Sequence, residues 1–320
     1  MSWQTSIIRH QEALPPRLVI TGGPGIGKTT FAASLPRPIL IDLDKGANEI
    51  KVDKVPAPKT WSDAIGLVRA IAADPGDYKS LVIDTLDPLE DLAEVAVCEE
   101  GIGKQGKRGS VADYDYGAGY EATSQKWRLM LAELDQVRAR GLLVCLLGHT
   151  IVRTAQDPTL GEYDEYTAQL QKKAWAETMR WADFVGFANF DSARVKDEKR
   201  AIVTTDRVLF TQRTSGVQAK NRYALPLKLP FTWAALEAGI RAHQAGVVQE
   251  TAATVIQRVE FLAKEIDAKG LKTKDNRSFV DVAKEKVLAC KLNVEWLREV
   301  EESLKQLNNT APNGAQGATP

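Results

Sequence analysis

Short apolar runs alternate with amphipathic segments along the first part of the chain. Runs of this length without polar interruption are typical of strands that are buried on both faces. The strand candidates are residues 18–21, 39–43, 81–83, 142–147 and 184–187, and the helix candidates between them are 28–35, 61–73, 121–139 and 168–181. The alternation predicts an α/β fold whose central sheet is mainly parallel, doubly wound and flanked by helices.

The pattern changes after residue 191. Residues 201–214 and 223–231 have strand-like composition and are separated by a segment with Gly216, which predicts an antiparallel extension of the sheet edge. Beyond residue 250 two apolar stripes have helical spacing, and we expect them to pack in a helical module rather than to bind a partner. The stripes consist of Val255, Val259, Leu262 and Ile266, and of Leu297, Val300, Leu304 and Leu307.

These changes divide the chain into four expected parts. Residues 1–16 lead into the fold, residues 17–245 form the α/β core, and residues 246–308 form a small C-terminal helical module. The remaining residues, 309–320, contain no core-forming side chains and are expected to be a disordered tail.

Composition and charge restrict the function classes. Lys plus Arg equal Asp plus Glu at 42 each, so no overall field attracts nucleic acid and any such surface must be local. Cys98, Cys145 and Cys290 lie far apart, which argues against a disulfide framework or a zinc site. The N-terminal segment lacks the apolar centre of a signal peptide, and no window is long and apolar enough for a spanning helix. We therefore expect a cytoplasmic protein without a membrane partner.

One motif carries specific chemistry. The segment GGPGIGKT fits the phosphate-binding pattern GxxxxGK[ST] and lies between a predicted strand and a predicted helix. Glycines allow backbone N–H groups to surround a phosphate, Lys28 can reach the terminal phosphates, and Thr29 can offer its hydroxyl to Mg²⁺. The predicted nucleotide-binding residues are Gly22, Gly23, Pro24, Gly25, Ile26, Gly27, Lys28, Thr29 and Thr30.

A phosphate loop of this kind also needs an acidic residue at the end of a neighbouring strand, because Mg²⁺ prefers oxygen ligands. The run LVID ends in Asp84. Thr29 and Asp84 are therefore the predicted magnesium residues.

With these motifs the chain resembles the RecA-like branch of P-loop ATPases. Within that branch it is similar to the small phage-encoded RecA-core proteins of single-strand annealing and recombination, an AAA domain of the phage nucleotide-binding type. The segment ILIDLDKG has Asp44 two residues beyond Asp42, where the family carries an acidic general base. The strand that ends in Asp84 is similar to the family's magnesium strand.

Two later segments extend the resemblance, which covers about residues 17–235. The run VCLLGHT ends near His149, where the family carries a polar sensor of the γ-phosphate. Residues 219–222, AKNR, resemble a motif whose cations, here Lys220 and Arg222, reach the nucleotide of a neighbouring subunit. The resemblance thus implies ATP and Mg²⁺ as ligands. It implies catalytic roles for Lys28, Asp44, His149, Lys220 and Arg222.

The resemblance also implies partners and a location. It implies a homo-oligomeric ring or filament that binds single-stranded DNA. A single-strand DNA-binding protein or other recombination proteins are further expected partners. The location would be the cytoplasm of a bacterial host cell if the protein is phage-encoded.

The residues themselves give two local signals for DNA. Residues 101–110 read as a flexible, basic loop, in which Lys104, Lys107 and Arg108 are the DNA-binding candidates. Three tyrosines that follow it, Tyr114, Tyr116 and Tyr120, offer rings for base stacking, although tyrosines near glycines more often pack a loop onto its domain. Residues 194–222 are also basic, whereas residues 151–166 are mainly acidic, which opposes phosphate contact.

Two other functions stay open. The motif at residues 219–222 is equally natural in a helicase or branch-migration motor of the RadA or DnaB kind. Alternatively, the chain is a regulatory or packaging ATPase whose partner is a protein that docks on the C-terminal helices.

Overall fold

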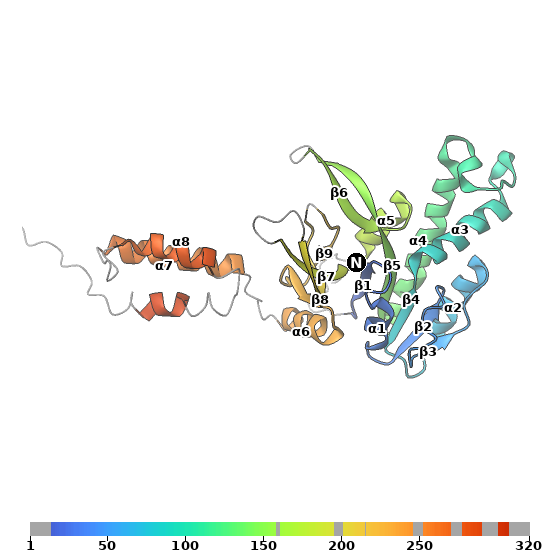
Figure 1. Cartoon of the computed structure of the whole chain (residues 1–320). Helices are drawn as coiled ribbons and strands as arrows, with labels where there is room; N and C mark the ends of the chain where they lie inside the picture. Colours follow the sequence, from blue (N-terminus) through green and yellow to red (C-terminus); the bar gives the residue numbers. More distant parts are fainter. Residues whose placement is uncertain are drawn as a thin grey trace, which may run out of the picture. The chain divides into compact units, whose positions relative to one another are not determined.

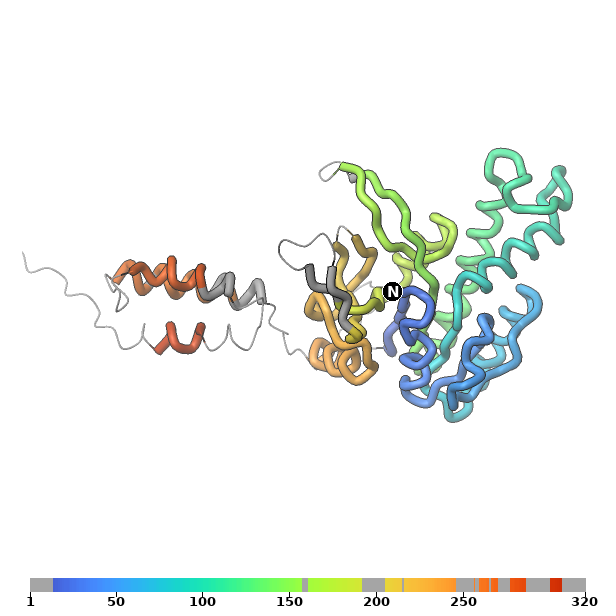
Figure 2. Tube along the Cα trace, in the orientation of Figure 1, coloured from blue at the N-terminus to red at the C-terminus, as the bar shows by residue number. Residues whose placement is uncertain are grey.

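The computed structural model describes residues 14–157, 161–194, 201–214, 216–245, 252–269, 277–289 and 300–306. Contacts divide the chain into two compact units, Met1–Val247 and Val248–Pro320, and each unit is described by itself. The first unit is an α/β fold with a central sheet between two layers of helices, shown in Figures 1 and 2. The expected fold class is confirmed.

The parallel part of the sheet has the spatial order β7-β1-β5-β4-β2-β3. These strands are β1 (Arg17–Gly22), β2 (Pro38–Asp42), β3 (Asp53–Val55), β4 (Ser80–Asp84), β5 (Leu143–Asp157) and β7 (Phe184–Arg194). The helices of the unit are α1 (Lys28–Ala33), α2 (Trp61–Ala73), α3 (Leu86–Glu100), α4 (Ala118–Ala139), α5 (Lys172–Trp181) and α6 (Trp233–Gln244). Because the strands are parallel, their carboxyl ends meet at one edge, where ligands bind in such sheets.

Both faces of the sheet are apolar. Neighbouring residues of each strand point to opposite sides, and the residues on both sides are apolar. Val19 packs on the side of α2, α3, α4 and α5, whereas Leu18 and Ile20 pack on the side of α1 and α6. Burial on both sides explains why these strands read as continuous apolar runs.

The antiparallel extension forms as predicted. Strand β8 (Ala201–Phe210) pairs with β7, and β10 (Lys228–Pro230) pairs with β8. The two-residue strand β9 (Lys220–Asn221) pairs with the beginning of β7.

Two expectations about residues 142–181 are wrong. Strand β5 does not stop at Leu147 but continues to Asp157 and pairs with β6 (Gly161–Ala168), so residues 151–157 and 161–166 are strands. Helix α5 begins at Lys172 instead of Ala168, because Ala168 still pairs with Thr150. Cross-strand pairing therefore overrides the local helical pattern at this position.

Helix α3 is absent from the sequence expectations. Its buried residues Leu86, Leu89, Ala93 and Val97 have helical spacing, but acidic residues between them obscure the apolar stripe. Figure 1 shows α3 beside α4, and contacts between these helices are extensive.

The connection between α3 and α4 is more ordered than expected. It contains the 3₁₀ turns η2 (Gly103–Gln105), η3 (Val111–Asp113) and η4 (Asp115–Gly117), and the Ile102 amide donates to the Gly106 carbonyl at 3.0 Å. Tyr114 is buried against Val97 and Val111, so it packs the connection onto the fold and is not free to stack on a base. Tyr116 is fully exposed and Tyr120 is partly exposed.

The second unit contains α7 (Ala252–Ala268), α8 (Phe279–Ala289) and a helical segment at residues 300–306. Val259, Leu262 and Ile266 share one apolar cluster with Val300 and Leu304, so these members of the two stripes pack together. The side chains of Val255, Leu297 and Leu307, residues 1–13 and the tail at 309–320 lie outside the described residues.

Among the residues that the structure describes, no helix combines the length and the apolar character needed to cross a bilayer.

Candidate nucleotide-binding site

The phosphate loop follows β1 and precedes α1, as the motif predicts. Gly25 and Gly27 have φ values of 74° and 98°, which a residue with a Cβ rarely adopts. Lys28 is buried, and its Nζ donates to the carbonyl oxygens of Gly22 and Gly23 at 3.0 and 3.1 Å. The lysine thus lies over its own loop, within reach of a phosphate bound there.

The electrostatics of Lys28 favour an anionic ligand. Burial lowers the pKa of its ammonium group, and the charges of Asp84, Asp87 and Asp44 oppose this shift. A desolvated cation gains more from a phosphate than an exposed one, because water screens it less.

Thr29 and Asp84 meet as the magnesium hypothesis requires. The Thr29 hydroxyl donates to Asp84 Oδ2 at 2.7 Å, although the two residues lie in different elements. Burial raises the pKa of Asp84, and the nearby carboxylates of Asp42 and Asp44 raise it further, whereas Thr29 and Lys28 oppose the shift. A cation beside Asp84 would relieve this unfavourable burial of negative charge.

Asp42 and Asp44 have different environments. Asp42 is buried and accepts hydrogen bonds from the amides of Gly46 and Ala47 and from Lys54 Nζ, so it fixes the loop after β2. The Asp44 amide donates to the Asp84 carbonyl at 3.1 Å, while the Asp44 side chain is 48% exposed. Its carboxylate is therefore accessible at the edge where the phosphate loop lies.

His149 lies beside the phosphate loop because β5 is the neighbour of β1, with His149 paired to Gly22. Its Nε2 is 3.9 Å from Asp44 Oδ2, and its Nδ1 is 3.1 Å from Asp87 Oδ2. The fold therefore gathers Lys28, Thr29, Asp44, Asp84 and His149, which are distant in sequence, around one loop.

A family model described as an AAA domain matches residues 14–223, about two thirds of the chain. The chain belongs to this AAA domain family. A comparison with curated proteins finds no match. The family match indicates an AAA, P-loop ATPase-type domain and includes every element that lines the phosphate loop.

The residues of this AAA domain fit a magnesium ion. Thr29 offers a hydroxyl oxygen and Asp84 a carboxylate oxygen, both of which are ligands that Mg²⁺ prefers. No described group of three or more His, Cys, Asp or Glu side chains forms a metal cluster. A site with few protein ligands suits Mg²⁺, which usually keeps waters and substrate phosphates as its other ligands.

The sequence expectations missed two charged residues of the AAA domain. Asp87, in the first turn of α3, contacts His149. The guanidinium of Arg207, on β8, lies next to the phosphate loop. A Cβ atom added to Gly27 would be only 2.8 Å from Arg207 Nη1. The position of Asp87 three residues after Asp84 is a signal that could have been used, whereas nothing local indicates Arg207.

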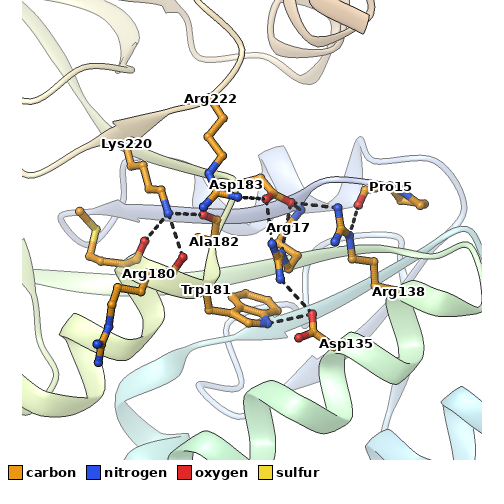
Figure 3. Close-up of polar contacts among 11 residues, drawn as sticks. Pro15, Arg17, Asp135, Arg138, Arg180, Trp181, Ala182, Asp183, Lys220 and Arg222 are labelled. Atoms are coloured by element: carbon orange, nitrogen blue, oxygen red, sulfur yellow. Dashed lines mark hydrogen bonds and ion pairs between the residues drawn. The ribbon is translucent and has the colours of Figure 1, made fainter. Parts of the chain in front are cut away.

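Lys220 and Arg222 lie elsewhere in the AAA domain. They are near the beginning of β7, because β9 pairs Lys220 with Val185, whereas the phosphate loop follows the end of β1. Lys220 Nζ donates to three carbonyl oxygens at the end of α5, those of Met179, Arg180 and Ala182, at 2.7, 3.0 and 2.7 Å (Figure 3). Neither residue is therefore beside the phosphate loop of its own chain.

Asp183 is the centre of a cationic cluster at this opposite edge. It pairs with Arg17 and Arg222 at 2.9 Å each and with Arg138 at 3.2 Å, as Figure 3 shows. Although burial by itself would raise the pKa of Asp183, its contacts with Arg17 and the charge of Arg138 lower it. Arg222 is 52% exposed, so it is the member that a second chain can approach most readily.

The DNA-binding candidates Lys104, Lys107 and Arg108 are exposed in the connection between α3 and α4. Lys107 and Arg108 line a hollow of about 570 Å³ that also contains the carboxylates of Asp91, Glu94 and Glu99. Cations and acids are thus mixed on this surface of the AAA domain.

Proposed function

We propose that this chain binds ATP with Mg²⁺, hydrolyses it, and uses the cycle as an oligomer in DNA recombination or single-strand annealing. The ATPase part is supported by the convergence of Lys28, Thr29, Asp84, Asp44 and His149 on one phosphate loop. Membership of the AAA domain family supports nucleotide binding by this loop.

In the proposed reaction the loop amides and Lys28 bind the phosphates, and Asp44 orients the attacking water and accepts its proton. When bound, Mg²⁺ would be held by Thr29 and Asp84 and would neutralise phosphate charge. His149 lies next to Asp44 and beside the phosphate loop. In the proposed reaction it senses the terminal phosphate.

Two variants test the ATPase. We expect Lys28→Ala to lose binding of a fluorescent ATP analogue, because the buried cation is removed. Asp44→Asn should keep that binding and lower kcat about 10²- to 10⁴-fold, as is typical for loss of a general base. Binding by Lys28→Ala with unchanged affinity would remove the proposed nucleotide site, and unchanged kcat in Asp44→Asn would remove the base.

The oligomeric part of the proposal depends on Arg222. Its side chain is half exposed at the sheet edge opposite the phosphate loop, so it is remote from the nucleotide site of its own chain. In the proposal it acts on the nucleotide of a neighbouring chain. A cation supplied in trans typically raises phosphoryl-transfer rates about 10³- to 10⁵-fold. ATP turnover per chain should therefore rise with protein concentration.

The DNA part is supported by the exposed cations Lys104, Lys107 and Arg108 and by the family resemblance of the motifs. The test is binding of single-stranded DNA over a salt series, with and without ATP and Mg²⁺. Affinity should fall steeply with salt, since phosphate contacts release counterions. Absence of binding at low salt would contradict the recombination role.

Two further measurements separate the rival functions. Directional, ATP-dependent unwinding of a duplex would favour a helicase or branch-migration motor. ATP turnover that no nucleic acid changes would favour a regulatory or packaging ATPase with a protein partner.

A further inference from the structure

A histidine bridges two carboxylates next to the phosphate loop. His149 Nδ1 lies 3.2 and 3.1 Å from the two oxygens of Asp87, and its Nε2 lies 3.9 Å from Asp44 Oδ2. The His149 and Asp87 side chains are only 21% and 20% exposed, whereas that of Asp44 is 48% exposed. The Nδ1 edge of the ring therefore faces the mostly buried Asp87, and the Nε2 edge faces the more exposed carboxylate of Asp44.

The position of Asp87 in the chain is set by the core. It is in the first turn of α3, between Leu86 and Leu89, which are both buried in the core under the sheet. Strand β4 leads into this helix directly after Asp84, so the same chain segment fixes both acidic residues. An ionised carboxylate can only accept a hydrogen bond, so the ring nitrogen beside it must carry the hydrogen that it donates. In the neutral ring, contact with Asp87 thus places the proton on Nδ1 and leaves a lone pair on Nε2.

The charge of Asp87 also reaches the phosphate loop. It is one of the three carboxylates, with Asp84 and Asp44, that oppose the lowering of the Lys28 pKa caused by burial. Asp87 is therefore part of the electrostatic environment of the nucleotide site as well as a partner of His149.

We propose that Asp87 is a positioning residue that fixes the His149 ring so that Nε2 and Asp44 together hold the water that attacks ATP. The inference rests on the proposed ATPase function. The separation of 3.9 Å between His149 Nε2 and Asp44 Oδ2 is too long for a direct hydrogen bond. In the Nδ1–H form of the ring, both of these atoms are acceptors. One water molecule can donate an O–H to each, at about 2.8 Å, which leaves an oxygen lone pair for the γ-phosphorus.

The reaction step is balanced by these groups. The water oxygen forms a bond to the γ-phosphorus while the bond from phosphorus to the bridging oxygen of ADP breaks. One water proton passes to the carboxylate of Asp44, and the other O–H continues to donate to His149 Nε2. Asp87 takes no proton and touches no reacting atom.

The test compares Asp87→Asn with wild type and with Asp91→Asn, an exposed aspartate one turn further along α3. We expect kcat for ATP to fall about 100-fold in Asp87→Asn, a size typical for loss of a group that orients a histidine. The dissociation constant for ATP should change less than twofold in both variants, and kcat of Asp91→Asn should equal that of wild type.

A second measurement reports on the His149 ring directly. The ¹⁵N NMR spectrum of the wild-type histidine rings, with His149 assigned through a His149→Gln variant, should show the hydrogen on Nδ1 and none on Nε2. In Asp87→Asn this form should be depleted, because an amide can also donate to Nδ1.

Four results would overturn the inference. They are an unchanged kcat in Asp87→Asn, an equal loss of kcat in the Asp91→Asn control, a loss of ATP affinity as large as the loss of kcat, and a wild-type His149 that is protonated at Nε2. Failure of wild type to bind or hydrolyse ATP would instead overturn the proposed function and this inference with it.

Discussion

Lys28 and Asp84 are charged side chains that the fold removes from water at the phosphate loop. Burial lowers the pKa of Lys28 and raises that of Asp84, so both charges are less favourable than in solvent. Each opposes the shift of the other, which limits the cost while no ligand is bound. Phosphate and a hard cation would each add the missing opposite charge, so both groups of a metal-bound nucleotide suit this site.

The first prediction concerns Gly27. A Gly27→Ala substitution would force a Cβ into a φ of 98° and to 2.8 Å from Arg207 Nη1. We expect a loss of about 1–2 kcal/mol in the free energy of unfolding, the usual cost of a left-handed residue with a side chain. Urea denaturation without nucleotide measures it. Gly23→Ala is the control, since a Cβ there meets no atom within 4 Å. Equal stability of the two variants would contradict the prediction.

The second prediction concerns Glu90, which is buried in α3. Its carboxylate accepts a hydrogen bond from the backbone amide of Gln171 at the start of α5. Burial raises its pKa from 4.5 to about 7. Between these values the folded state keeps a proton that the unfolded state has lost, so the free energy of unfolding falls as pH rises. Glu90→Gln should not show this fall, and its stability relative to wild type should increase by about 2–3 kcal/mol between pH 4.5 and 7.

Chemical denaturation of Glu90→Gln and wild type at several pH values makes the comparison. Glu100→Gln, at the end of α3, gives the matched control because the Glu100 side chain is 63% exposed and pairs with Lys126. A stability difference between Glu90→Gln and wild type that does not change with pH would exclude the raised pKa.

At the scale of elements, the short strand β9 has two structural effects. It pairs with the beginning of β7, and it brings the Lys220 ammonium to the last carbonyls of α5. A cation at a helix C-terminus is favourable because the final carbonyl groups have no partners within the helix. Burial lowers the pKa of Lys220, and the nearby charge of Arg222 adds to this shift.

The third prediction follows from that contact. Lys220→Ala should destabilise the protein by about 1–3 kcal/mol, because three carbonyl oxygens lose their donor. Lys173→Ala, at the other end of α5, removes an exposed ion pair with Glu121 of α4 and should cost less than about 1 kcal/mol. Thermal denaturation compares the two. Equal stability combined with a loss of ATP turnover in Lys220→Ala alone would show that Lys220 acts on a nucleotide instead.

The fourth prediction concerns Arg207, which antiparallel pairing of β8 with β7 directs to the phosphate loop. Loss of a charged contact to a phosphate costs about 1.5–3 kcal/mol, so Arg207→Ala should weaken ADP and ATP binding about 10- to 100-fold. Calorimetry measures the affinity. Arg213→Ala, beyond the end of β8 and paired with Glu165, should bind like wild type. Equal affinities in both variants would leave Arg207 without a role in binding.

At the scale of the whole molecule, the phosphate loop and the cationic cluster around Asp183 lie at opposite edges of one sheet. A head-to-tail contact between identical chains would bring these edges together, and repetition of such a contact gives rings or filaments. The proposed trans role of Arg222 depends on this arrangement.

The fifth prediction tests it by mixing two inactive variants. Lys28→Ala keeps Arg222 but lacks a working loop, whereas Arg222→Ala keeps the loop but lacks the cation. In mixed oligomers, some subunit contacts join an intact phosphate loop to an intact Arg222. ATP turnover should therefore recover and pass through a maximum as the ratio of the two variants is varied. Each variant alone, at the same total concentration, is the control. If no mixture is more active than its components, Arg222 does not act in trans.

Sequence spacing predicted much of the first unit because the determining interactions are local. The phosphate loop requires glycines and a following helix at fixed offsets, and strands buried on both faces must be continuous apolar runs. The antiparallel extension at residues 201–214 was predicted for the same reason. The hairpin of β5 and β6 was not, because pairing of Thr150 with Ala168 depends on a partner strand rather than on local propensity.

The sequence alone therefore determined the α/β class, the phosphate loop and Asp84, the acidic residue that contacts Thr29 at the end of this loop. Only the tertiary structure decided which distant side chains meet. Sheet order places His149 beside Gly22, the first turn of α3 brings Asp87 to that histidine, and β8 brings Arg207 to Gly27. It also moves Lys220 and Arg222 to the other edge of the sheet. Local patterns encode the period of an element but not its neighbours, and contacts across strands depend on those neighbours.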